Sequence, residues 1–85
     1  MKTNWKELFE ETFPLTKDKL SDLVMTLNMK ELEERFDSGY GGAEGRPFTA
    51  WSKDWVYFPV CYDGSEWIGF VPRNPCEIAT EHKGG

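Results

Sequence analysis

The side chains that could carry acid–base or nucleophilic chemistry are few and poorly placed for it. The chain has one histidine, His82, near its C-terminal end, where a rigidly positioned catalytic group is hardest to build. Asp54 and Asp63 stand in expected turns, in which an aspartate commonly hydrogen-bonds its own backbone. The adjacent Glu10 and Glu11 would point about 100° apart on a helix and would not share one proton. The pattern therefore predicts that the protein is not an enzyme.

Metal and phosphate binding are also poorly supported. Cys61 and Cys76 are the only cysteines, and His82 would be a third ligand where a structural zinc site usually has four. The glycine-rich loop 38–46 follows an expected helix rather than a strand, and it lacks the Gly-Lys-Ser/Thr of phosphate loops. We expect no metal and no cofactor. We interpret the loop as a flexible connection, with the alternative of a flap over a ligand that has Tyr40 at its tip.

Length and charge restrict the classes of partner. The 85 residues suit a single domain, and the net charge of −5 is spread along the chain. Such a surface repels the phosphates of nucleic acids and anionic membranes. The polar N-terminus and the lack of an apolar run of about 20 residues indicate a cytoplasmic protein with reduced thiols. Direct nucleic-acid or membrane binding is not expected, and an acidic decoy of a nucleic-acid-binding protein is the alternative to simple solubility.

An aromatic stretch is the most informative part of the chain. Large rings contribute most of the burial free energy in small cores and interfaces. We therefore expect this stretch to form the centre of the fold and to supply any binding surface. Its rings are Phe48, Trp51, Trp55, Tyr57, Phe58, Tyr62, Trp67 and Phe70. The candidate residues for binding a partner or ligand are Trp51, Trp55, Tyr57, Trp67 and Tyr40.

The elements that would position these rings begin with a helix. Apolar residues recur at helical spacing from Trp5 to Phe13. Asn4 is a suitable N-cap, and Glu7 occupies the third helical position, as in a capping box. Pro14 is expected to end the helix, because its ring clashes with the preceding turn and it has no N–H to donate.

Residues 16–37 show helical periodicity on two nearly opposite faces. The two sets are Leu20, Leu23, Val24 and Leu27, and Met25, Met29, Leu32 and Phe36. One straight helix would need burial on both sides, so we predict two helices, 17–27 and 29–37, that are separated at Asn28. Asn28 and Glu31 repeat the N-cap and third-position pattern. A single helix buried in a dimer would also explain the two faces.

The aromatic stretch predicts an antiparallel meander over residues 47–72. The strands are expected over 47–51, 55–62 and 66–71, with turns at 52–54 and at Asp63-Gly64. The middle strand is apolar on both faces, with Trp55, Tyr57 and Cys61 on one and Val56, Phe58, Val60 and Tyr62 on the other. One face should cover the helices, and the second should meet something else. Pro59 cannot donate to a ladder, so it should lie at an edge or a bulge.

The chain is therefore predicted to have an α+β fold. Two or three N-terminal helices within residues 4–37 pack on the three-stranded meander. The tail, residues 73–85, contains either a short helix over 75–82 or a fourth strand over 77–80.

A small acidic domain with a second apolar sheet face is typical of a non-catalytic interaction module. We expect it to form a homodimer or to bind another protein, because small domains often gain stability by association. This character suits an accessory or inhibitor protein of a bacterial mobile element or phage. The alternative is a binder of a small apolar or aromatic ligand, held in an aromatic-lined pocket between sheet and helices.

Overall fold

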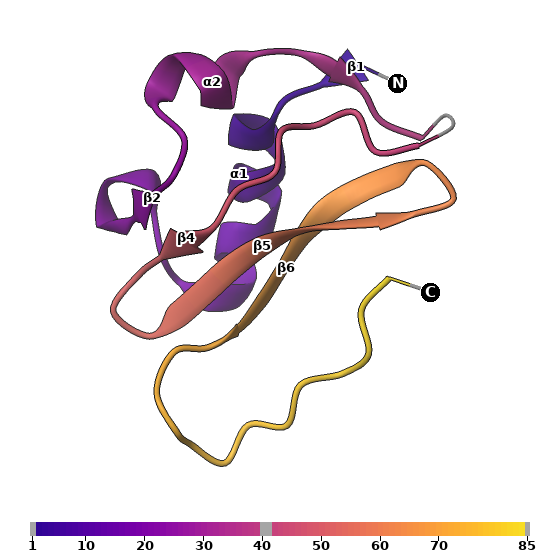
Figure 1. Cartoon of the computed structure of the whole chain (residues 1–85). Coiled ribbons are helices and arrows are strands. Elements are labelled where there is room, and N and C mark those ends of the chain that lie inside the picture. The colour runs from indigo at the N-terminus through magenta and orange to yellow at the C-terminus, as the bar shows by residue number, and fades with distance from the viewer. Residues whose placement is uncertain (1, 40–41, 85) are drawn as a thin grey trace.

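Three strands form the predicted meander. In the computed structural model, which describes residues 2–39 and 42–84, they are β4 (Ala50–Trp51), β5 (Trp55–Tyr62) and β6 (Ser65–Pro72) (Figure 1). Asp63 and Gly64 connect β5 to β6 with φ values of 52° and 80°, as a two-residue hairpin turn requires. The first strand is much shorter than the predicted 47–51. The expected α+β architecture with an antiparallel meander is confirmed.

The sheet contains one strand that the sequence did not predict. β2 (Val24–Met25) pairs antiparallel with β4, so the strand order is β2-β4-β5-β6. β2 and η1 (Leu20–Asp22), a single 3₁₀ turn, replace the predicted helix 17–27. A strand sends Val24 and Met25 to opposite faces of the sheet, whereas a helix would place them only about 100° apart. Both apolar sets are thereby accommodated without a helix buried on two sides.

The second predicted helix is also shorter than expected. α2 (Met29–Glu33) begins at Asn28 as predicted, and the capping box is complete: the Glu31 N–H donates to Asn28 Oδ1 at 2.8 Å, and the Asn28 N–H donates to Glu31 Oε1 at 3.0 Å. The prediction that the helix continues to residue 37 is wrong. Beyond Glu33 the chain leaves the helix, and β3 (Phe36–Asp37) pairs with β1 (Lys2–Thr3). The alternative of one continuous helix over residues 16–37, buried in a dimer, is also excluded, because this segment contains η1, β2, α2 and β3.

The N-terminal helix, α1 (Trp5–Thr16), has the predicted start and a different end. The Asn4 side chain accepts the Glu7 N–H at 2.8 Å, which confirms the N-cap. The prediction that Pro14 ends the helix is wrong, because α1 continues to Thr16 with Pro14 inside its last turn. The helix continues although Pro14 has no N–H to donate to the carbonyl of Glu10. The helix closes instead at Lys17, whose positive φ of 67° is typical of a residue that follows a helix.

The core lies between α1 and one face of the sheet. Phe9 and Tyr57 are fully buried, and their ring centroids are 5.4 Å apart. Phe48 joins them, with its centroid 5.5 Å from that of Phe9 and 4.9 Å from that of Trp5. The Trp5 indole N–H donates to the Arg46 carbonyl at 3.1 Å, so this large buried ring has a polar partner. These rings occupy the space between the sheet and α1.

The C-terminal tail forms neither of the predicted alternatives. Residues 73–84 contain no helix over 75–82 and no strand over 77–80, and they return along the sheet as an irregular segment (Figure 1). The Arg73 N–H donates to the Asp54 carbonyl at 2.8 Å, and the Lys83 ammonium lies 5.6 Å from the centroid of the Phe70 ring. A helix this short is marginal unless it buries an apolar face, and the side chains of this segment are almost all exposed.

The buried Tyr57 hydroxyl makes stability depend on pH in the alkaline range. It donates to Asp18 Oδ2 at 2.6 Å and lies 2.8 Å from Thr16 Oγ1. Burial, followed by the hydrogen bond to Asp18, raises the pKa of Tyr57 above its ordinary value of 10.0. The folded state therefore holds the neutral phenol, while the unfolded chain loses its proton at lower pH.

We expect the Tyr57 contribution to stability to be complete below about pH 10 and to decrease as the pH rises above it. Urea unfolding between pH 8 and pH 11.5 measures this dependence. Tyr57→Phe should be less stable at pH 8 by about 1–3 kcal/mol, because it loses a hydrogen bond to a carboxylate. The difference in unfolding free energy between the wild type and Tyr57→Phe should decrease at high pH. A difference that stays constant to pH 11.5 would contradict the proposed role of the buried Tyr57 hydroxyl.

Candidate protein-interaction surface

The residues considered for catalysis or metal binding remain dispersed. Asp63 stands in the β5–β6 turn, Asp54 in the β4–β5 connection and His82 in the tail. Across residues 2–39 and 42–84, no three His, Cys, Asp or Glu side chains are grouped as metal ligands would be. Cys61 and Cys76 are both exposed thiols.

Glu66, which the sequence did not single out, is a buried titratable side chain with a clear structural task. It is only 5% exposed, and its two carboxylate oxygens accept the backbone N–H groups of Glu44 and Gly45, both at 2.9 Å. Gly45 also approaches Trp5 so closely that a Cβ would lie 2.5 Å from the ring. The glycine-rich segment is a connection, as predicted, but one that is fixed at residues 44–45. Tyr40, the predicted tip of a flap, lies outside the described residues.

Among the described residues, ion pairs join α1, α2 and the segments that follow α2. Arg46 Nε binds Glu34 Oε1 at 2.6 Å, and Arg46 Nη1 lies 3.5 Å from Glu31 Oε2. The hydrogen bond from Arg46 lowers the pKa of Glu34. Arg35 Nη1 contacts Glu7 Oε2 at 2.9 Å and so connects the segment after α2 to α1.

The sheet face turned away from α1 carries apolar rather than charged side chains. Successive side chains on a strand point to opposite faces, and paired residues share a face. Tyr57 points to α1, so its neighbours Val56 and Phe58 point away from it. We call the apolar side chains on that side the outer sheet face: Val24, Trp51, Val56, Phe58, Val60, Tyr62, Trp67 and Val71. Ser65 and Gly69 lie on the same side.

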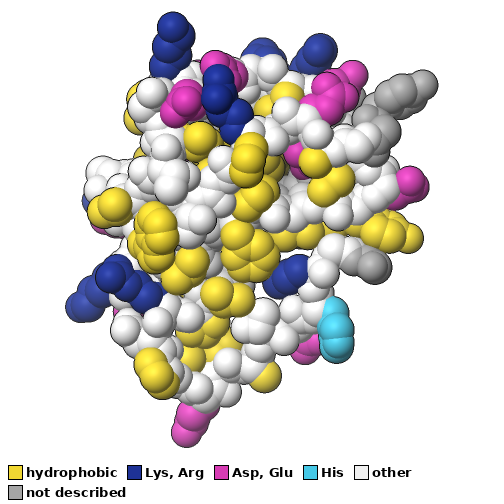
Figure 2. Space-filling model, in the orientation of Figure 1, with side chains coloured by type: hydrophobic (Ala, Val, Ile, Leu, Met, Phe, Trp, Pro, Cys, Tyr) yellow, Lys and Arg dark blue, Asp and Glu magenta, His cyan; other side chains and the backbone are white. Residues whose placement is uncertain are grey.

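The outer sheet face is apolar and partly open to solvent. Val24 is 71% exposed, Tyr62 58% and Trp67 36%, and no charged residue of β4, β5 or β6 points to this side. β5 crosses in front of α1 in Figure 1, and Figure 2 shows a band of apolar side chains across the middle of the same view. The Phe58 ring also covers Gly69, where a Cβ would lie 2.7 Å from it. A solvated sheet face would alternate with polar residues, and a contiguous apolar patch is typical of a binding site.

The structure separates the predicted binding residues into two groups. Trp51 and Trp67 lie on the outer sheet face. Trp55 and Tyr57 lie on the opposite face, where Tyr57 is fully buried and the Trp55 ring packs edge-on against Phe70 with centroids 5.3 Å apart. A surface contact could therefore use the first two but not Tyr57.

Several residues of this surface were not selected from the sequence. They are Val24, Val56, Phe58, Val60, Tyr62 and Val71. The alternation along residues 55–62 did group Val56, Phe58, Val60 and Tyr62 on one face. The sequence did not show which of the two faces packs against α1.

The prediction for Pro59 is confirmed. β4 pairs with β5 only as far as Tyr57, so among the described strands residues 58–62 have a partner on the β6 side alone. Pro59, which has no N–H, therefore lies at an edge of the sheet.

Comparison with protein-family models, with curated proteins and with solved structures found no match to this chain. Within the part of the chain that the structure describes, no helix is long and apolar enough to cross a membrane.

Proposed function

We propose that this protein is a non-catalytic interaction module that self-associates through its outer sheet face. The observation that carries the proposal is the uncharged apolar character of that face, on a domain whose core is complete on the other side of the sheet. The exposed Tyr62 and Trp67 are of the residue types that dominate interface energetics.

A two-fold dimer is the arrangement that suits this surface. Two sheets can pack face to face about 10 Å apart, and a C2 pair buries the same patch on both copies. A standard interface takes about 800 Å² from each partner, which is about a seventh of the 5666 Å² surface of this chain. The net charge of −5 on each copy opposes pairing, so added salt should strengthen the dimer.

Light scattering on a sizing column, at two protein concentrations, tests the proposal. We expect a mass near twice 9.9 kDa at the higher concentration. Trp67→Ser should weaken the dimer by at least about thirtyfold, the effect of losing about 2 kcal/mol at an interface hot spot. Leu15→Ser is the matched control, because Leu15 is 71% exposed on α1, away from the sheet.

A monomeric wild-type mass at both concentrations, or an unchanged dimer in Trp67→Ser, would show that the self-association proposal is wrong.

The finer proposal of an accessory or inhibitor protein from a bacterial mobile element or phage, acting in the cytoplasm, rests on the small size and the acidity of the chain. In that role the same face would bind a host protein.

A further inference from the structure

β6 is the last strand of its sheet, so one side of its backbone has no neighbouring strand. Tyr62 and Ser65 flank the two-residue turn and therefore exchange both of their backbone hydrogen bonds. Because this pattern alternates along an antiparallel pair, every second residue of β6 directs its N–H and C=O away from β5. These outward backbone groups, which we call the β6 edge, belong to Glu66, Ile68, Phe70 and Pro72.

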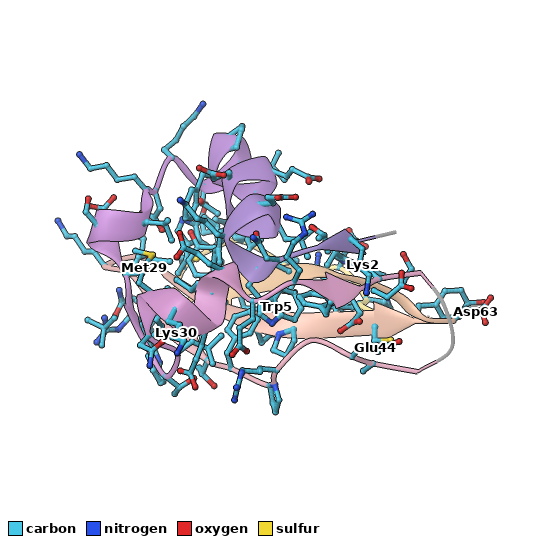
Figure 3. The ribbon with its side chains drawn as sticks, turned by 90° about the horizontal axis from the view of Figure 1, so that it is seen from above. Lys2, Trp5, Met29, Lys30, Glu44 and Asp63 are labelled. Carbon is cyan, nitrogen blue, oxygen red and sulfur yellow. The ribbon has the colours of Figure 1, made fainter. Side chains whose placement is uncertain are left out.

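Both ends of the β6 edge are closed. The Ser38 hydroxyl accepts the Glu66 N–H at 2.9 Å and donates to the Glu66 carbonyl at 3.4 Å. In Figure 3, Asp63 marks the tip of the hairpin, and Glu44, whose N–H donates to the Glu66 side chain, lies beside the hairpin near that tip. At the other end, Pro72 has no N–H and is the last residue of the strand.

The middle of the β6 edge is open. Within the described residues, the N–H and C=O groups of Ile68 and Phe70 have no hydrogen-bond partner. Ile68 is nevertheless only 4% exposed. The backbone groups of buried residues are almost always paired, so an unpaired set at a buried residue indicates a partner outside the chain. That partner has to supply two donors and two acceptors.

A second copy of β6, related to the first by a two-fold axis at Gly69, supplies this set. Ile68 of each copy then lies opposite Phe70 of the other, and four hydrogen bonds pair all the open groups. The two Gly69 residues face each other in a non-hydrogen-bonded pair, where strands approach most closely and glycine adds no side chain. Pro72 falls opposite Glu66, and neither needs the other, because Glu66 is bonded within its own chain.

β6 itself carries little that would prevent such pairing. Charged side chains, prolines and bulges are the usual protection of an edge strand. Glu66 is the only charged residue of β6, and its carboxylate is occupied by the N–H groups of Glu44 and Gly45. The only proline is Pro72, at the end of the strand.

The C-terminal tail lies beside the Phe70 end of the β6 edge and covers it loosely. The Lys83 ammonium is 5.6 Å from the Phe70 ring centroid, and a hollow of about 150 Å³ separates residues 78–83 from the sheet (Figure 1). Among the described residues, no hydrogen bond joins residues 75–84 to the rest of the chain. The tail can therefore move aside without the loss of a hydrogen bond.

We propose that β6 pairs antiparallel with β6 of a second copy, centred on Gly69, so that two sheets become one continuous sheet. The contact uses backbone groups at the sheet border and not the outer sheet face. It is therefore independent of the face-to-face dimer proposed above, and it can join two such dimers. Four ordinary backbone hydrogen bonds correspond to a dissociation constant of about 1 mM, so this contact forms at higher concentration than the face contact.

Amide hydrogen exchange of the full chain, followed by NMR at about 0.05 mM and about 1 mM, tests the proposal. We expect the Ile68 and Phe70 amides to exchange about twofold more slowly at the higher concentration, because about half of the chains are then paired. The Gly69 and Val71 amides donate to β5 in either state and should change less. Exchange at Ile68 and Phe70 that is independent of concentration would overturn the proposal.

The same measurement on Trp67→Ser separates this contact from the face-to-face dimer. Trp67 points to the outer sheet face, so its replacement weakens that dimer and leaves the β6 edge in place. The slowing at Ile68 and Phe70 should persist in Trp67→Ser. If it disappears there, the effect belongs to the face contact, and pairing through the β6 edge is wrong.

Two substitutions at Phe70 test the register. Both Phe70→Ala and Phe70→Pro lose the ring that packs on Trp55, but only Phe70→Pro loses the N–H at the β6 edge. The concentration-dependent slowing at Ile68 should persist in Phe70→Ala and be absent in Phe70→Pro. Equal slowing in the two variants would contradict the pairing of Ile68 with Phe70. Should Phe70→Pro fail to fold, the wild-type exchange at Ile68 and Phe70 decides.

Discussion

Replacement of Phe9 by alanine is expected to lower the free energy of unfolding by about 3–5 kcal/mol. The side chain is fully buried, and its ring lies 5.6 Å from that of Phe13, 5.5 Å from that of Phe48 and 5.4 Å from that of Tyr57. Truncation removes these contacts and leaves a cavity that rigid neighbouring rings cannot fill. A domain of this length has a total stability of roughly 4–13 kcal/mol, so the loss is a large part of it.

Urea unfolding followed by circular dichroism measures this effect. Leu15→Ala is the control on the same helix, because Leu15 is 71% exposed and its truncation should change stability by less than about 0.5 kcal/mol. Equal effects of the two substitutions would show that α1 does not pack on the sheet through Phe9.

Replacement of Glu66 by alanine is expected to cost about 2–4 kcal/mol and to release residues 44–45. Hydrogen bonds to a charged group contribute about 1.5–3 kcal/mol each, and this carboxylate accepts two, from the N–H groups of Glu44 and Gly45. Water can reach part of the released segment, which is why the expected cost is below the simple sum. Glu66→Gln keeps one acceptor oxygen and should lose about half as much.

Amide hydrogen exchange at Glu44 and Gly45 distinguishes local release from global unfolding. In Glu66→Ala both amides should exchange faster by a larger factor than amides in the centre of β5. Glu77→Ala, an exposed tail residue, controls for the loss of one negative charge. Protection at both amides that survives in Glu66→Ala would contradict the assigned tether.

The features that the sequence predicted correctly depend on a few neighbouring residues. The Asn4 cap and the Asn28–Glu31 capping box form between residues three positions apart. The Asp63-Gly64 turn needs only two residues that tolerate positive φ. The strand over 55–62 follows from a run of β-branched and aromatic residues and has the predicted bounds.

The sequence also predicted two apolar faces on β5 but not their roles. Alternation separates Tyr57 from Val56 and Phe58 without showing which set is buried. α1 decides this, because Phe9 packs on Tyr57 and Asp18 accepts its hydroxyl. The candidate residue Tyr57 is consequently fully buried, Trp55 lies on the same face as Tyr57 and not on the outer sheet face, and Phe58 was not selected.

Residues 16–37 show most clearly what the sequence by itself determined and what only the tertiary structure decided. The sequence determined that this segment carries two sets of apolar residues and a break at Asn28, and both features are present. It did not determine the conformation of Val24 and Met25, because a strand of two residues has no periodicity of its own. These residues become a strand only through pairing with Trp51 and Ala50, far along the chain. The strand β2 and the position of Val24 on the outer sheet face depend on that pairing, so they arise from contacts between distant segments rather than from any local pattern.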